Sequence, residues 1–548
     1  MEQSVKIETS AEHTTGQPKK KKTRKPVKEK ILSLEDILWN CRNLLRGKAS
    51  LANRRDVILT LVFLKFVGER FIAQRQKIWQ ELSDKNIPPE LMEKLIDDRN
   101  FYQKDSVFFL PDECRWETIL TTAPERLTLT LDNVIAQLDR QEEKLHGALP
   151  QQIFTNTNLQ GKDLKSLIDE INKISSNRFQ EKDLIGRVYE YFLQAFSINA
   201  DKEEGEFYTP HSIVELIAAL IEPYDGTIYD PCCGSGGMFV QAAKFVEAHG
   251  GNTRTIQVYG QESQPETYRL AKMNLAIRGI SSDLGNTAVS TFTNDLHKDL
   301  KVDYIMANPP FNLRKWRNKN ELLTDYRWNG YAVPPEGNAN YAWILHMLSK
   351  LNVVNGVAGF LLANGALDDG DTFAIRKQLI ENDKIEAIIV LPREMFYSTD
   401  ISVTIWILNQ NKRGGTYHGR NQRDRTGEIL FVDLRTWSQN IYEKKFVQFL
   451  PEQIERAATI YHTWQTEGTD SASYAVPELY RSVRLDEIRS NGYSLAPSRY
   501  IEFIDRDKDI DYKKIISDAA SKVSELIGRQ QINQEELKKA FRELGYEC

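Results

Sequence analysis

The chain has 548 residues, of which 41% are hydrophobic and 27% charged, and its formal net charge is -5. This length suggests about three domains, and the hydrophobic share is sufficient for globular cores. The sequence contains no long uncharged apolar run and no signal peptide, which argues against a membrane protein and against a secreted one.

The five cysteines are scattered along the chain and form neither a C-x-x-C pair nor a metal-ligand spacing. They are Cys41, Cys114, Cys232, Cys233 and Cys548. We therefore expect reduced thiols in a cytoplasmic protein without a structural metal.

The first 30 residues form a basic tail, because residues 19–30 contain eight basic residues and one acidic residue. Such a tail is either a disordered solubilising extension or a tether for nucleic acid. The rest of the chain is acidic, so DNA binding should require local basic patches or a partner.

Apolar residues recur every three or four positions across residues 31–180, which predicts an all-α N-terminal domain. Within it, LTLVFLKFVGERF is too apolar for an exposed helix and should be packed. DLIGRVYEYFLQAFS, residues 183–197, predicts one more helix leading into the next domain.

Residues 181–435 alternate short apolar runs with helical segments, which predicts an α/β domain with a largely parallel sheet. The expected strands are GTIYD, QVYGQE, VDYIMA, GVAGFLLA, IEAIIVL and VTIWILN. A weaker strand at residues 289–293 brings the number to about seven, and EILFVDLR is a candidate edge strand.

Residues 436–548 are polar and predict a helical C-terminal region. Ile515, Ile516, Ala519, Val523 and Ile527 form one apolar stripe. The stripe would pack either on the chain's own domain or on a helix of a partner.

A glycine-rich loop, DPCCGSGGMF, follows the first predicted strand. Its glycines allow a tight turn and close approach of a ligand to the N-terminus of the next helix. The loop suits several nucleotide-like cofactors, but it lacks the spacings typical of NAD and ATP sites. Glu262 ends the next strand, where a carboxylate suits the hydroxyls of a ribose.

The segment DYIMANPPFN, residues 303–312, ends a strand abruptly. Pro309 and Pro310 donate no backbone hydrogen bonds, and Asn308 is pushed toward an extended conformation. The segment therefore presents rigid acceptors to a ligand.

The order DPxxGSGG, an acidic strand end, ND and NPPF resembles the S-adenosylmethionine-dependent amino-methyltransferases. GEFYTPHSIVELIAALI, LWNCRNLLRG, DLIGRVYEYFL and GYSLAPSRY resemble the modification subunit of type I restriction-modification systems. This resemblance covers roughly residues 31–505 and implies a Rossmann-like methyltransferase sheet, an all-α N-terminal domain and a helical C-terminal extension. The lysine-rich tail is not part of the family pattern.

The resemblance implies methyl transfer to N6 of an adenine flipped out of double-stranded DNA. The side-chain oxygen of Asn308 and the carbonyl of Pro309 would accept the two amino hydrogens, so that no strong general base is needed. Phe311 would stack on the base, an interaction worth about 1–3 kcal/mol, although it could instead be a core aromatic. The predicted catalytic residues are Asn308, Pro309, Pro310 and Phe311.

The predicted cofactor-binding residues follow from the same resemblance. Glu262 would hold the ribose and Asp295 would lie near the adenine amino group, although Asp295 could instead cap a turn. The methionine end would contact the remaining members of the set, which are Tyr208, Thr209, Pro210, Asp230, Gly234, Ser235, Gly236 and Gly237. Cys232 and Cys233 are interpreted as packing residues of this loop rather than as a cytosine-directed nucleophile.

Two basic stretches, LRKWRNKN and NKRGGTYHGRNQRDR, flank the predicted site in sequence. Both could contact DNA phosphates beside the target pocket without reading sequence, or they could be solvated loops.

The resemblance also implies partners and leaves alternatives open. A specificity subunit would choose the DNA sequence and bind two copies of this chain, each through the C-terminal region of this chain. A restriction subunit would join for cleavage. Methylation of ribosomal RNA guanine or of a protein glutamine is an alternative, but the helical N-terminal domain is surplus to it. An inactive scaffold is disfavoured because the glycine loop, Glu262, Asp295 and NPPF are intact.

Overall fold

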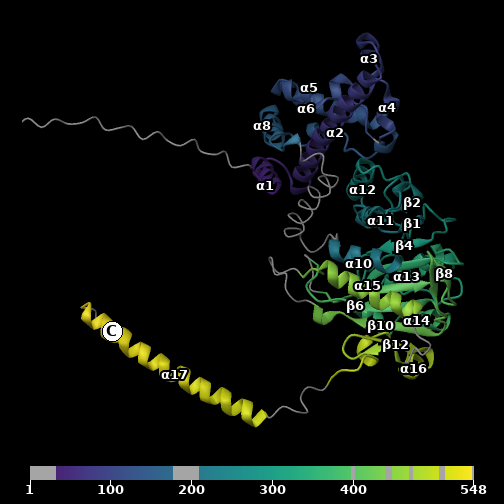
Figure 1. Cartoon of the computed structure of the whole chain (residues 1–548), viewed down its shortest axis with the longest axis vertical. Coiled ribbons are helices and arrows are strands. Elements are labelled where there is room, and N and C mark those ends of the chain that lie inside the picture. Colours follow the sequence, from purple (N-terminus) through teal and green to yellow (C-terminus); the bar gives the residue numbers. More distant parts are fainter. Residues whose placement is uncertain are drawn as a thin grey trace, which may run out of the picture.

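The computed structural model describes residues 32–105, 107–176, 209–396, 401–437, 447–467, 473–504 and 512–545 (Figure 1). The basic tail, the helix predicted at residues 183–197 and Tyr208 lie outside the described residues.

Residues 32–176 fold into helices, as the periodicity predicts. The helices are α1 (Leu34–Leu44), α2 (Leu51–Asp84), α3 (Pro89–Leu95), α4 (Arg99–Gln103), α5 (Trp116–Thr121), α6 (Pro124–Gln141), α7 (Ile153–Asn156) and α8 (Gly161–Asn172). A reciprocal capping box between Ser33 and Asp36 starts α1. The most apolar part of α2 is buried, with Leu61 and Val62 fully covered, so this helix forms the centre of the helical core.

The second part of the chain contains a sheet of ten strands in the order β11-β12-β10-β6-β7-β5-β4-β1-β2-β3. The strands are β1 (Gly226–Asp230), β2 (Ile256–Gly260), β3 (Ser282–Asp283), β4 (Tyr304–Ala307), β5 (Val357–Ala363), β6 (Ile385–Val390), β7 (Val403–Asn409), β10 (Glu428–Asp433), β11 (Ala475–Val476) and β12 (Tyr480–Arg484). Five of the nine neighbouring pairs are parallel, whereas β7 runs antiparallel to β5 and β6, and β12 runs antiparallel to β10 and β11. The α/β prediction is therefore confirmed.

Three details of the predicted sheet are wrong. Residues 289–293 form no strand, and the strand of this region is β3. EILFVD is not at the edge, because β10 lies between β6 and β12. The region predicted as helical after residue 436 contributes β11 and β12, which are short and carry exposed or charged residues that hide the strand pattern.

Helices cover both faces of the sheet (Figure 1). One face buries α10 (His211–Ile221), α11 (Gly237–Ala248), α12 (Pro265–Ile277) and α15 (Pro451–Thr466), and the other buries α13 (Asn340–Lys350), α14 (Phe373–Glu381) and α16 (Leu485–Ser490). Gly359 on β5 permits a close approach of α10, because a Cβ there would lie 2.9 Å from Ile217.

The helical domain packs on the outer side of α12. Leu270, Met273 and Ala276 of this helix belong to the helical domain's core, and the Lys272 ammonium donates to the His146 carbonyl at 3.1 Å. Helix α12 follows the strand that ends at Gly260, so it links the helical domain to the predicted cofactor side of the sheet.

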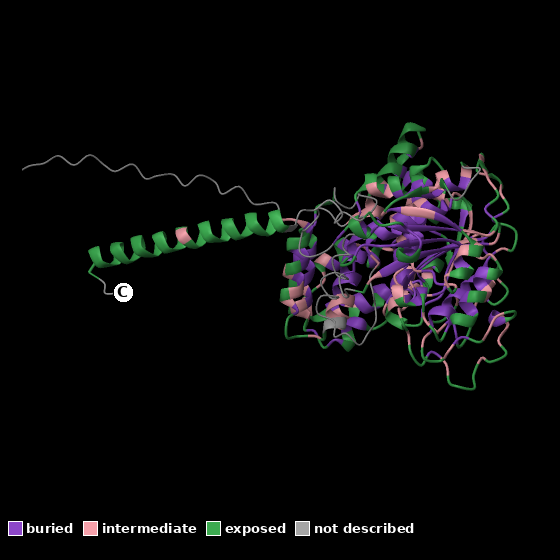
Figure 2. Ribbon diagram, turned by 90° about the horizontal axis from the view of Figure 1, so that it is seen from below, coloured by how far each residue is buried: buried purple, intermediate pink, exposed green. Residues whose placement is uncertain are grey.

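The C-terminal helix α17 (Tyr512–Glu543) differs from the rest of the chain in its burial. All of its residues whose burial is described are exposed, apart from Gly528, which is partly exposed (Figure 2). Ile516 is 66% exposed and Val523 54% exposed, so the predicted stripe does not pack on the chain's own domain. In the part of the chain that the structure describes, no helix is long and apolar enough to cross a membrane.

Candidate active site

The predicted target-binding asparagine and the glycine loop lie close together at the C-terminal ends of two neighbouring parallel strands. Strands β1 and β4 pair in parallel, with Tyr229 opposite Ile305, so Asp230, which ends β1, and Asn308, which follows β4, lie at neighbouring strand ends. The carboxyl edge of a parallel sheet is where open α/β folds bind ligands.

The Asn308 amide is held in one orientation. Its Nδ2 donates to Thr209 Oγ1 at 2.8 Å, whereas its Oδ1 is buried and accepts no hydrogen bond from any described residue. A buried acceptor without a partner is costly unless a ligand satisfies it. Thr209 directly precedes Pro210, the N-cap of α10, so the start of this helix lies against the strand end that carries Asn308.

The glycine loop has the backbone conformation that its sequence predicts. Gly234 and Gly236 have φ of +52° and +78°, in the left-handed region that favours glycine. Gly236 is the N-cap of α11, and the Asn274 side chain donates to the Ser235 carbonyl at 2.8 Å. The loop therefore presents a helix N-terminus to its ligand.

Glu262 fastens the glycine loop to the end of β2. Its Oε2 accepts from the Gly234 N–H at 3.0 Å, and its Oε1 accepts from the backbone of Ser263 and Gln264 at 2.7 and 2.8 Å. Because each carboxylate oxygen has about two acceptor positions, Oε2 retains one for a further donor.

Asp230 is a buried carboxyl group, 1% exposed, at the end of β1. Burial and the nearby Glu262 carboxylate raise its pKa to about 7, against the opposing effect of a 3.0 Å hydrogen bond from the Cys232 N–H. A buried carboxylate of this kind favours a cationic ligand, which would restore its charge.

Asp295 lies in a buried ion pair. The Lys350 ammonium, which has no exposed side-chain surface, lies 2.7 Å from Asp295 Oδ2, and the Tyr326 hydroxyl donates to the same oxygen at 2.5 Å. Burial acts to raise the pKa of Asp295, but the nearby His346 together with Lys350 and Tyr326 outweighs it and holds the pKa below its ordinary value. Oδ1 accepts from the His297 N–H at 3.1 Å and is the oxygen that retains acceptor capacity.

Phe311 is half-buried beside the Asn308 strand end. Its ring meets the Phe396 ring edge to face, with centroids 5.8 Å apart. Pro309 is buried and Pro310 partly exposed, so the NPPF segment places one rigid face toward the protein and leaves another accessible.

The surroundings of Cys232 and Cys233 do not favour a nucleophilic thiolate. Burial raises the pKa of both thiols well above the ordinary value, and the neighbouring Asp230 carboxylate raises them further. Cys233 donates its backbone N–H to the Gln261 carbonyl at 2.9 Å, which fits a structural role in the loop. Within the described ranges, no group of His, Cys, Asp and Glu is arranged to hold a metal ion.

Several residues that organise the site were not predicted from the sequence. Gln261 is fully buried, donates to the carbonyls of Val289 and Asn294 and accepts from the Leu296 N–H, so it positions the chain around Asp295. Asn340 binds the turn after Phe311. For Gln261, a polar residue directly after an apolar strand was an available signal; for Asn340, it was the asparagine pair before an apolar helix.

Only one of the two basic stretches lies near this edge. LRKWRNKN follows NPPFN and borders a cavity of about 710 Å³, whose lining contains Asn312, Arg314, Arg317 and Lys319 together with the acidic residues Glu336, Asp369 and Asp371. Arg317 is occupied by backbone carbonyls, including that of Pro334 at 2.8 Å. Arg314 and Lys319 are exposed.

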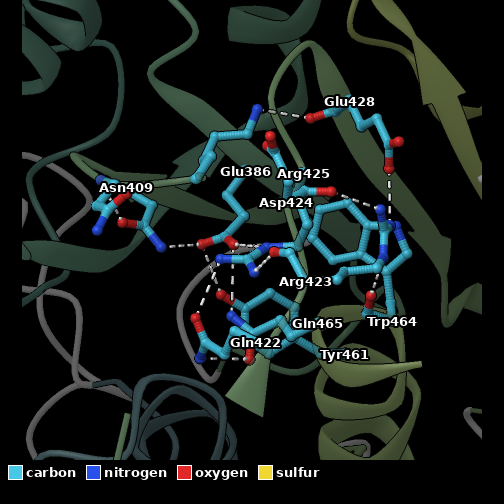
Figure 3. A network of polar contacts seen from close by, with 12 residues as sticks. Glu386, Asn409, Gln422, Arg423, Asp424, Arg425, Glu428, Tyr461, Trp464 and Gln465 are labelled. Atoms are coloured by element: carbon cyan, nitrogen blue, oxygen red, sulfur yellow. Dashed lines mark hydrogen bonds and ion pairs between the residues drawn. The ribbon is translucent and has the colours of Figure 1, made fainter. Parts of the chain in front are cut away.

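The second stretch lies at the opposite end of the sheet, so its predicted position beside the target pocket is wrong. It follows Asn409, which pairs with Val357 at the start of β5. Arg425 is fully buried and donates to Glu386 at 2.9 Å, in a network that also joins Asn409 and Tyr461 to this carboxylate (Figure 3). Arg425 therefore contributes to the fold rather than to a DNA-binding surface.

Comparisons with known proteins find related sequences along almost the whole chain. The model of the N-6 DNA Methylase family matches residues 180–509, and that of the HsdM N-terminal domain matches residues 34–171. The "Type I restriction enzyme HindI methylase subunit" of Haemophilus influenzae is 36% identical over 80% of this chain and 100% of its own length.

Two further relatives extend this picture. The "Type I restriction enzyme MjaIX methylase subunit" of Methanocaldococcus jannaschii is 32% identical over 93% of this chain and 91% of its own. The solved type I restriction-modification methyltransferase subunit of Streptococcus thermophilus superposes with a TM-score of 0.67 at 22% identity, covering 86% of this chain and 99% of that chain, and so shares the fold.

Proposed function

The chain belongs to the N-6 DNA methylase family as a methylase subunit of the type I restriction class, and we propose that its methyl donor is S-adenosylmethionine. It is an adenine-N6 DNA methyltransferase subunit. The observation that carries the assignment of its site is the Asn308 amide at the strand end beside the glycine loop, whose buried Oδ1 accepts no hydrogen bond from the residues that the structure describes.

Asn308 explains how an adenine amino group can become a nucleophile. The nitrogen lone pair of this group is conjugated with the purine ring. When Asn308 Oδ1 and the Pro309 carbonyl accept its two hydrogens, the lone pair leaves conjugation and becomes available in a fixed direction. The Thr209 hydroxyl oxygen accepts a hydrogen bond from Asn308 Nδ2, which fixes the amide so that Asn308 Oδ1 would face the base.

Phe311 then holds the base itself. A partly exposed ring braced by Phe396 offers a face on which an extruded adenine stacks. Base stacking on an aromatic ring is worth about 1–3 kcal/mol, which helps to offset the cost of leaving the duplex.

The residues around the glycine loop suit S-adenosylmethionine, which supplies an electrophilic sulfonium methyl group when bound. The buried Asp230 would pair with the cationic α-ammonium group of its methionine part. Glu262 Oε2 would accept from one ribose hydroxyl, and Asp295 Oδ1 from the adenine amino group. The predicted contact of Tyr208 belongs to the same proposal.

We further propose that the chain works in the cytoplasm on double-stranded DNA together with a specificity subunit. Arg314 and Lys319, exposed beside the NPPF turn, are suited to phosphates on either side of the extruded base. Two copies per specificity subunit and a restriction subunit complete the proposed assembly, with the exposed stripe of α17 as the docking element.

The test is long-read mapping of N6-methyladenine in DNA from the source cells, with the chain intact and with Asn308→Ala. We expect methylation at one split, two-part sequence to disappear, because loss of a preorganised acceptor costs at least about 100-fold in rate. Asn355→Ala, an exposed substitution at the opposite end of the sheet, is the control and should leave the map unchanged. An unchanged map in the Asn308→Ala cells would redirect the assignment to RNA or protein substrates.

A further inference from the structure

The turn that follows Phe311 is held in an unfavourable backbone conformation. Asn312 has φ of +54°, in the left-handed region, although it is not glycine. Asparagine tolerates this region better than most residues, but it still needs surrounding contacts to stay there. Because Asn312 is the next residue after Phe311, its conformation directs the chain that carries the ring.

Asn340 supplies these contacts from the start of α13. Its Oδ1 accepts from the Asn312 N–H at 3.0 Å, and its Nδ2 donates to Asn312 Oδ1 at 2.9 Å. Asn340 is only 3% exposed, so its own side of both bonds is shielded from water, although Asn312 is exposed. The two residues thus form a reciprocal pair that is bound at two points.

Neighbouring residues strengthen the same connection. Asn338 Nδ2 donates to Asn312 Oδ1 at 3.2 Å, while Asn338 Oδ1 accepts from the Asn340 N–H at 2.9 Å. The Ala339 N–H donates to the Leu313 carbonyl at 3.0 Å. Residues 338–340 therefore clasp residues 312 and 313.

The Asn340 side chain does not serve helix α13. The N-cap of α13 is Ala339, which makes no side-chain capping bond, and the Asn340 amide points across to the other loop. The helix is anchored independently by Lys350, through Asp295, and by His346, whose Nε2 lies 3.1 Å from the Tyr229 hydroxyl. Loss of the Asn340 amide should therefore free the turn without displacing the helix.

We propose that Asn340 is a positioning residue for the target base: it keeps the Phe311–Asn312 turn closed so that the Phe311 ring is ready to receive an extruded adenine. Asn340 acts on the base side of the site and not on the cofactor side. This inference rests on the proposed function of NPPF.

The experiment uses the full chain purified from its own cells with the subunits that bind it, and a duplex that contains the mapped methylation site. Asn340→Ala should lower kcat/KM for DNA by roughly tenfold, the scale expected when a binding group is slightly misplaced. With 2-aminopurine at the target adenine, the fluorescence increase that reports base extrusion should fall in parallel. The dissociation constant for S-adenosylmethionine should change less than about twofold.

The rescue is Asn312→Gly in the Asn340→Ala background. Glycine adopts the left-handed conformation without a steric penalty, so the turn no longer depends on the clasp. We expect this double variant to recover part of the fluorescence increase and of kcat/KM. Asn338→Ala, which removes one weaker bond to Asn312 and the acceptor of the Asn340 N–H, should give a smaller effect in the same direction and is informative even if Asn340→Ala is poorly folded.

The outcomes separate the inference from the function on which it rests. A wild-type complex that does not methylate adenine would overturn both. A wild-type complex that methylates normally, with Asn340→Ala unchanged in fluorescence or with cofactor affinity lost to the same extent as DNA activity, would overturn the positioning role alone. Failure of Asn312→Gly to restore any signal would also overturn it.

Discussion

The surroundings of the Asp230 carboxyl group disfavour its ionised form when no cation is bound. Its pKa is raised from 3.8 to about 7 because it is buried and lies near Glu262. In the free protein the folded state therefore holds this proton more tightly than the unfolded chain does. As the pH rises from the pKa of Asp230 in the unfolded chain through its pKa in the folded protein, Asp230 ionises and the free energy of unfolding decreases.

A pH-dependent cofactor affinity follows from this shift. A cationic α-ammonium group binds only the ionised carboxylate, so affinity for S-adenosylmethionine should fall by up to about tenfold per unit as pH drops below about 7. Calorimetric titration between about pH 6 and about pH 8 measures this dependence. Asp230→Asn should bind weakly and with a flat profile, whereas a flat wild-type profile would contradict the pairing.

At this scale the sequence could predict residues that end strands but not residues that support them. Asn308, Asp230 and Glu262 lie at or within two residues of the ends of apolar runs, and parallel strands present their C-terminal ends on the same side, so local pattern was sufficient to bring them together. Asn340 and Lys350 reach their partners across 28 and 55 positions of chain. No local pattern carries such a tertiary contact.

Among the elements, α13 has contacts at both ends with the site, through Asn340 at its start and Lys350 at its end. The Lys350–Asp295 pair is buried, and such pairs are costly to break from one side because the remaining charge stays unpaired. The pair therefore holds the loop that carries Asp295 against this helix.

Lys350→Met should consequently reduce the free energy of unfolding by about 3–5 kcal/mol. Asp295→Asn combined with Lys350→Met removes the orphaned charge and should recover more than half of that loss. Chemical denaturation of the three proteins measures both effects. Equal stability of the single and double variants would show that the ion pair is not the source of the loss.

Prediction of whole strands succeeded where the apolar run was long and failed where the strand was short. The six apolar runs became β1, β2, β4, β5, β6 and β7, and burial on both faces is nearly continuous in β4, β5, β6 and β7, which leaves a clear pattern. β12 buries only two of its five residues and β3 none, so neither differs from a loop in sequence. The basic residues of 411–425 look like a DNA-binding loop in sequence, yet Arg425 belongs to the interior.

At the scale of the whole molecule, burial divides the chain into a packed body and an exposed helix. The body includes residues 447–467 and 473–504, which add α15 and the last strands to the catalytic sheet. α17 exposes apolar side chains along much of its length, among them Ile516, Val523 and Ile527. Such an apolar stripe in water is typical of a surface that a partner covers.

A version of the chain that ends before residue 512 should therefore keep the thermal midpoint and the cofactor affinity of the full chain, because exposed side chains contribute little to the stability of the body. It should no longer co-purify with other subunits. Glutamate at Ile516, Val523 and Ile527 should have the same effect. Ser521→Glu with Arg529→Glu adds equal negative charge away from the stripe and should retain assembly, so loss of assembly in this control as well would assign the effect to charge rather than to apolar docking.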